Sequence, residues 1–247
     1  MMDELELLLK GWGNYSPYFW SLFYLILANV LRKWSPKVML HSIFHCMTST
    51  FMAGCTVYIV SGGHLFTMDM YRILAYDVDD SQKDLLKQVA YHSAGYFVGD
   101  TIDIKLDYKN EKRQQFVLHH IAALVGLTTV YFDSWMSIYG LYLLEAGGVV
   151  HHIKHAAHVW QWQPPFSTIA EVLYHVIYLG SRILLFGTAV KATYNIGDSK
   201  QIYLDIMCCG AVFVLVPQNL VWWVKNAKDS LKGIDLGNTE EIPKKVD

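Results

Sequence analysis

The residues best suited to chemistry are two adjacent histidines, His119 and His120, inside an apolar stretch of the chain. Adjacent helical residues point about 100° apart, so one ring can face a cavity while the other bonds a neighbouring helix. A histidine in a partly dry site can act as a general base or carry an acyl group. A carboxylate such as Glu145, Asp100 or Asp103 can orient the ring and stabilise its cation. We therefore take His119, His120, Glu145 and Asp100 as candidate catalytic residues.

Other ionisable side chains recur in the apolar stretches, where each costs roughly 2.5–3.5 kcal/mol to insert into lipid and so marks a cavity or pathway. By helical arithmetic, the ionisable residues of three stretches each fall on one stripe, which favours helices around a shared polar interior. The competing interpretation is that these groups pair with one another and only hold helices together. The stripes comprise His41 and His45; His92, Asp100 and Asp103; and Glu171, His175 and Arg182.

A polar cavity is thus expected, with lining residues beyond the four catalytic candidates. Arg182 can meet an anionic headgroup, or it can pair with Asp100 or Glu171, and the sequence leaves this choice open. The candidate cavity-lining and lipid-binding residues are His92, Tyr96, Asp103, His175 and Arg182.

A second group of histidines is a candidate metal site. His151, His155 and His158 share one helical face within about 60°, so they could meet one ion, as in a histidine-cluster membrane metal enzyme. The competing interpretation is a set of interfacial histidines beside Lys154. The sequence as a whole gives no expectation of a resident metal or other cofactor.

The composition favours a membrane protein. Of 247 residues, 53% are apolar and only 17% are charged, and the mean hydropathy is +0.23. A soluble domain carries about 25% charged residues. The formal net charge of −2 excludes the basic face that a nucleic-acid-binding protein needs.

Apolar stretches long enough to form membrane helices recur along the whole chain. They predict an all-α, polytopic integral membrane bundle of about seven transmembrane helices around a polar cavity, although the fifth stretch could be re-entrant. We divide the chain into an N-terminal segment with the first helix (1–37), a main domain (38–225) and a tail (226–247). The seven stretches are 17–31, 38–60, 88–106, 115–132, 135–153, 166–192 and 202–224.

Most lysines and arginines outside these stretches lie on the side of the C-terminal tail, which predicts a cytosolic tail. The tail carries Lys244 and Lys245 as its fourth-last and third-last residues, like a di-lysine retrieval signal. Such a signal is an address read by a receptor, here the retrieval coat. We therefore expect residence in the endoplasmic reticulum, with cycling through the early Golgi.

Three motifs resemble the TLC domain, which is shared by ceramide synthases, the translocating-chain-associating membrane protein and small TLC-domain proteins. The resemblance runs from about Met39 to Lys225, and it implies a helical bundle around a lipid-accessible cavity in the endoplasmic reticulum. It also implies that His119 and His120 are catalytic, as the paired histidines are in ceramide synthases. The motifs are Gly-Tyr-Phe-Val-Gly-Asp at 95–100, Phe-Val-Leu-His-His-Ile-Ala-Ala-Leu at 116–124 and Leu-Leu-Glu-Ala at 143–146.

The sequence departs from the synthase pattern in one respect, because residues 137–145 lack the His-Asp pair and the second aspartate that synthases carry before Leu-Glu. The first hypothesis is accordingly a protein of lipid homeostasis that binds, moves or regulates membrane lipids. The second is an acyl-CoA-dependent N-acyltransferase that uses His119 and His120, with acyl-CoA as substrate. The third is the membrane metal enzyme. A chaperone or cargo receptor also stays open. The expected partners are membrane lipids, not nucleic acid.

Overall fold

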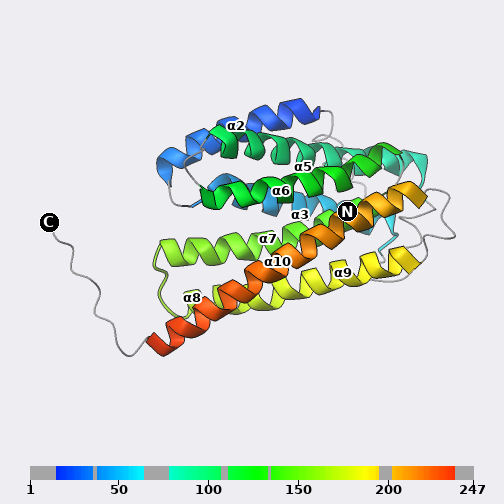
Figure 1. Ribbon diagram of the computed structural model, residues 1–247. Coiled ribbons are helices and arrows are strands. Elements are labelled where there is room, and N and C mark those ends of the chain that lie inside the picture. The colour runs from blue at the N-terminus through cyan, green and yellow to red at the C-terminus, as the bar shows by residue number, and fades with distance from the viewer. Residues whose placement is uncertain are drawn as a thin grey trace.

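The computed structural model describes residues 15–35, 38–63, 78–106, 111–132, 135–194 and 202–236, and these ranges are almost entirely helical (Figure 1). The elements are α2 (Pro17–Trp34), α3 (Leu40–Val60), α5 (Asp80–Leu106), α6 (Glu111–Thr128), a 3₁₀ turn η1 (Thr129–Phe132), α7 (Met136–Val159), α8 (Phe166–Leu173), a π-helical turn η2 (Tyr174–Tyr178), α9 (Leu179–Tyr194) and α10 (Ile202–Leu236).

Each predicted apolar stretch contains a long helix, and the prediction of an all-α bundle is confirmed. The helix α3 and the segment Phe166–Gly187 are long and apolar enough to cross a membrane by length and composition. Because α8, η2 and α9 follow one another without a gap, they form one continuous rod. The helix α7 has 24 residues, which favours a full crossing over a re-entrant segment.

The helix α2 shows how one helix separates an apolar outer face from the core. Leu22, Ile26 and Val30 are four residues apart and about half exposed, at 59%, 56% and 47%. Tyr24 and Ala28, on the opposite face, are buried. In a membrane the outer stripe faces lipid, because only the inner face packs against protein.

The helices α2 and α5 approach so closely that two glycines are required between them. A Cβ atom on Gly95 would lie 2.3 Å from the Cβ of Trp20 and 2.7 Å from the backbone oxygen of Pro17. A Cβ on Gly99 would lie 2.7 Å from the backbone oxygen of Ser21. Small residues permit such close packing of membrane helices, and both glycines belong to the 95–100 motif.

At one end of the bundle, which we name the tail end, α2, α5 and α7 end and α3, α6 and α8 begin. The C-terminal end of α10 lies there too, at the left of Figure 1. The helix residues near this end carry many positive charges, which agrees with the bias in the sequence. They include Arg32, Lys33, Lys105, Lys154 and Lys225.

The prediction that Glu171, His175 and Arg182 share one stripe is wrong. The π-helical turn η2 lies between the first two residues and the third. A π turn holds one more residue than an α turn, so it rotates every later side chain by roughly 100° about the helix axis. Glu171 and His175 therefore stay together toward Lys154, while Arg182 is buried against α7 and α10.

Candidate functional site

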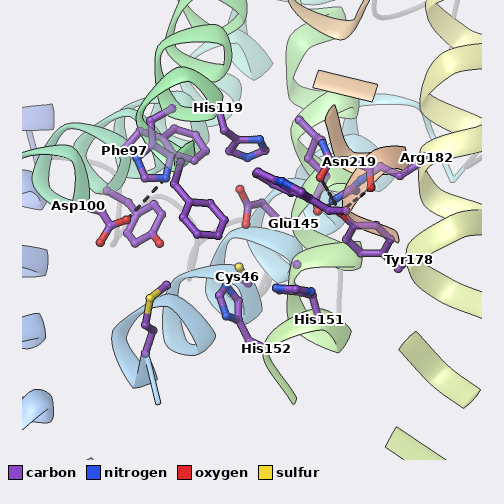
Figure 2. A pocket seen from close by; sticks show the side chains of 17 residues that line it. Cys46, Phe97, Asp100, His119, Glu145, His151, His152, Tyr178, Arg182 and Asn219 are labelled. Atoms are coloured by element: carbon purple, nitrogen blue, oxygen red, sulfur yellow. Dashed lines mark hydrogen bonds and ion pairs between the residues drawn. The ribbon is translucent and has the colours of Figure 1, made fainter. Parts of the chain in front are cut away.

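A cavity of about 70 Å³ lies in the tail-end half of the bundle, between α3, α5, α6, α7, α9 and α10 (Figure 2). Aromatic and aliphatic side chains form part of its wall, including Phe97, Phe116, Leu144 and Trp222. Polar and titratable side chains from every one of these helices complete it. They are Cys46, Asp100, His119, His120, Glu145, His151, His152, Arg182 and Asn219.

His120 is held at both ring nitrogens. Its Nδ1 lies 3.1 Å from the hydroxyl of Thr101, and its Nε2 lies 3.6 Å from a carboxylate oxygen of Asp100. The other oxygen of Asp100 lies 3.0 Å from Nε2 of His41. Asp100 thus stands between two imidazoles and fixes the orientation of the His120 ring from the neighbouring helix.

His119 differs from its neighbour. Its Nδ1 is buried and has no hydrogen-bond partner among the described residues. The ring lies near Trp222 and His120, with ring centroids 6.0 and 5.9 Å apart. Figure 2 shows it directly above the Glu145 carboxylate in the middle of the cavity. A neutral imidazole with an open nitrogen can accept a proton from a ligand or attack a carbonyl carbon.

Glu145 is buried beneath His119 and is positioned from α3. Its Oε1 lies 3.6 Å from Nε2 of His45, and the thiol of Cys46 is hydrogen-bonded to it. There is room for that thiol because Gly148 has no side chain: a Cβ there would lie 2.8 Å from the Cys46 sulfur. The carboxylate is thus fixed at the floor of the cavity.

A chain of aromatic and imidazole groups continues from Glu145 away from the cavity. Nδ1 of His45 lies 3.4 Å from the hydroxyl of Tyr24, which lies 2.7 Å from Nε2 of His92. The ring of Tyr96, which also lines the cavity, stacks on His45 with centroids 3.6 Å apart. His92 therefore supports the site from behind rather than lining it, and Tyr24 and His45 act as its links.

Arg182 occupies the opposite wall to Asp100 and is only 3% exposed. Its Nη1 donates to the backbone carbonyls of Leu143 and Leu144, each at 3.1 Å. Its guanidinium lies over the ring of Tyr178, 4.4 Å from the centroid. Among the described residues it makes no ion pair, so it pairs with neither of the two carboxylates that the sequence offered as partners.

Two other predicted lining residues lie outside the cavity. Asp103 accepts from the guanidinium of Arg32, and both residues belong to the tail end. His175 lies 2.9 Å from Glu171, whose carboxylate also binds Lys154 at 2.8 Å. Both groups neutralise charge between neighbouring helices. The structure therefore brings together six of the predicted residues, namely Asp100, His119, His120, Glu145, Tyr96 and Arg182, and leaves His92, Asp103 and His175 outside.

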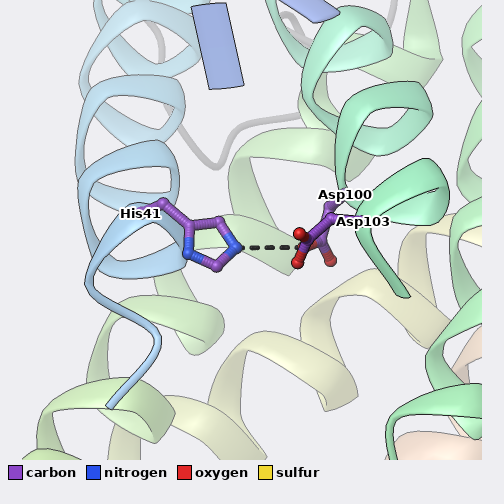
Figure 3. Close-up of side chains that lie close together, drawn as sticks. All are labelled: His41, Asp100 and Asp103. Carbon is purple, nitrogen blue, oxygen red and sulfur yellow. Dashed lines mark hydrogen bonds and ion pairs between the residues drawn. The ribbon is translucent and has the colours of Figure 1, made fainter. Parts of the chain in front are cut away.

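The predicted metal-binding histidines do not meet. His151 lines the cavity, whereas His155 and His158 are exposed. Within the described ranges, one group does place possible ligand atoms within 4.8 Å of one another, namely His41, Asp100 and Asp103 (Figure 3). Arg32 forms an ion pair with Asp103, and His41 contacts Asp100, so these residues join α2, α3 and α5.

Several lining residues were not predicted from the sequence, among them Cys46, His152, Asn219 and Trp222. His152 and Asn219 carried a usable signal, because each is a polar residue inside a predicted membrane stretch. Cys46 and Trp222 carried none, since cysteine and tryptophan are ordinary residues of an apolar helix. Lys244 and Lys245, the predicted retrieval signal, lie outside the described residues.

Comparison with known proteins identifies a protein family for this chain. The family model described as TLC domain matches residues 49–228. A curated protein, the divinyl chlorophyll a/b light-harvesting protein PcbA of Prochlorococcus marinus (strain NATL2A), is 27% identical over 124 residues, which cover 49% of this chain. The match spans 34% of the length of that protein, about a third. No solved structure matches the chain.

Proposed function

Because the chain belongs to the TLC-domain family of helical membrane proteins, we propose that its cavity binds the polar head of a membrane lipid, and that the protein acts in lipid homeostasis. The action is lipid binding, lipid transport or regulation of membrane lipid composition. The observation that carries this proposal is the cavity itself. Titratable groups from separate helices converge on a space within a bundle whose outer faces are apolar.

The chemistry of the lining fits the head of a lipid better than a wholly apolar ligand. A pocket for an acyl chain alone would be lined by aliphatic and aromatic groups. This cavity holds the open nitrogen of His119, the carboxylate of Glu145 and the cation of Arg182 (Figure 2). Each can form hydrogen bonds with a polar headgroup while the acyl chain stays among the apolar helix faces.

We propose the endoplasmic reticulum membrane as the location, with the tail end facing the cytosol and with cycling through the early Golgi. The support is the positive charge of the tail end, since Arg32, Lys33, Lys105 and Lys225 all lie near it. The di-lysine pattern at Lys244 and Lys245 also favours a tail on the cytosolic side. The cavity would then open toward the cytosolic leaflet.

A second candidate function is transfer of an acyl group from acyl-CoA to a lipid amine, and the His119 geometry favours it. His119 would take the proton of the amine as nitrogen attacks the thioester carbonyl, and the CoA thiolate would leave and be reprotonated. The Asp100–His120 pair would stabilise charge beside it. The departure of residues 137–145 from the synthase pattern stands against this candidate.

The two candidates are separated by lipid analysis of cells that express wild type, His119→Ala, His120→Ala or His158→Ala. The last is a control, because His158 is exposed and lies outside the cavity. We expect wild type and His158→Ala to shift the level of one lipid class several-fold, and His119→Ala to abolish most of that shift.

Purified protein completes this test. Acylation of a long-chain amine by wild type with acyl-CoA, lost in His119→Ala, would identify the protein as a transferase. Retained lipid without turnover would identify a binding or transport protein. Lipid profiles that are identical for vector, wild type and all three variants would contradict the proposed function.

A further inference from the structure

The cavity contains one buried cation with no counter-charge supplied by the described part of the chain. Arg182 is 3% exposed and makes no ion pair there, although it lies at the depth of the apolar helix segments. Its Nε is buried and has no hydrogen-bond partner among the residues that the structure describes. A buried charge is stable only when it is paired or fully hydrogen-bonded. The guanidinium can therefore donate to one more acceptor, such as a negatively charged group.

The guanidinium is held in a fixed position with one edge available. Nη1 donates to two backbone carbonyls of α7 and to the hydroxyl of Ser181, whereas Nη2 lies at a longer 3.5 Å from the side-chain oxygen of Asn219. The arrangement depends on Gly147, since a Cβ there would lie 2.7 Å from Nη1. Tyr178 supports the flat face of the group and donates to the same Asn219 oxygen at 2.6 Å.

The charges around the cavity favour an anion at this wall. The carboxylates of Asp100 and Glu145 face imidazoles of His41 and His45. Figure 2 places Arg182, Asn219 and Tyr178 together on one side of the cavity, with Asp100 on the other and Glu145 between them. An incoming negative group is therefore drawn to the Arg182 wall and repelled from the opposite one.

We propose that Arg182 is an anion subsite, and that the lipid bound in this cavity carries a carboxylate as its polar end. The inference rests on the proposed function and names its ligand class. A carboxylate is the smallest two-oxygen acceptor that matches the planar donors of a guanidinium, and the cavity is small, at about 70 Å³.

The test compares oleate with methyl oleate, which has the same chain but no charge. Binding is measured for the purified full-length protein in nanodiscs of phosphatidylcholine. We expect wild type to bind oleate at least tenfold more tightly than methyl oleate. Arg182→Gln should lose this preference, and Arg182→Lys should keep part of it. Gly180→Ala is the matched control on the same rod, because a Cβ there meets no atom within 4 Å.

Equal binding of oleate and methyl oleate by wild type would overturn the inference, and so would binding of neither. This comparison needs no variant, so it decides the matter even if Arg182→Gln fails to fold. Dioleoyl phosphatidate that displaces oleate at lower concentration would overturn the carboxylate in favour of a phosphate lipid. A preference for oleate unchanged in Arg182→Gln would overturn the role of Arg182.

The outcome is separable from that of the proposed function. An oleate preference that depends on Arg182, found together with unchanged cellular lipids, would support the subsite and contradict the role in lipid homeostasis. A lipid shift that depends on His119, found without an oleate preference, would do the reverse.

Discussion

Gly95→Ala is expected to destabilise the protein strongly, although it adds only one methyl group. The added Cβ would lie 2.3 Å from the Cβ of Trp20 and 2.7 Å from a backbone oxygen of α2, and neither atom can turn away. Relieving such overpacking costs about 3 kcal/mol, which in a chain of this size lowers the Tm by roughly 10 °C. The measurement is thermal unfolding of the purified protein in detergent.

The control for this prediction is again Gly180→Ala, where the new methyl group meets open space. Alanine is a better helix former than glycine by about 1 kcal/mol, so this variant should keep or slightly raise the Tm. If Gly95→Ala instead unfolds at the wild-type temperature, α2 and α5 are not packed as described.

Gly148→Ala is expected to prevent lipid from binding in the cavity without unfolding the bundle. Its Cβ would lie 2.8 Å from the Cys46 sulfur and 3.6 Å from a Glu145 oxygen, so the thiol must turn into the space that a lipid head would fill. Overpacking of about 1–3 kcal/mol, with about 1.4 kcal/mol equal to a factor of ten, predicts that lipid retention falls by about fivefold to a hundredfold. Mass spectrometry of lipids that copurify with the protein measures it.

Two variants make this second prediction specific. Gly140→Ala adds the same methyl group to the same helix at an ordinary 3.4 Å contact with Leu185, away from the cavity, and should retain lipid like wild type. Cys46→Ala, added to Gly148→Ala, removes the clashing sulfur and should restore most of the lipid. Failure of the second change to restore it would show that the sulfur contact is not the cause.

The helices could be predicted from the sequence because the membrane sets the length of their apolar segments. The residues at which the helices begin and end were harder to predict. The helix α5 begins at Asp80, eight residues before the predicted stretch, and α10 continues to Leu236 rather than 224. Both extensions are polar turns, which hydropathy cannot separate from loops. The membrane bundle and the TLC domain are confirmed, whereas the proposed limits of the domains stay predictions.

Part of the site was predictable because ionisable groups in apolar helices mark a polar interior. His119 and Asp100, chosen because they are ionisable residues in apolar stretches, both line the cavity. Helical arithmetic failed for His175, since no residue type in 174–178 announces a π turn. It also could not tell the wall from the layer behind it, where His92 lies, because that depends on how far apart the helices pack.

The most direct test of a lipid head in the tail-end cavity is photocrosslinking with a long-chain carboxylic acid that carries a diazirine near its carboxyl group. The crosslinked residues of the full-length protein are identified by peptide mass spectrometry. The structure predicts adducts at cavity residues such as Phe116, Leu144 and Trp222, suppressed in Gly148→Ala and by excess oleate. Adducts spread over the outer stripe of Leu22, Ile26 and Val30 instead, unaffected by either, would contradict it.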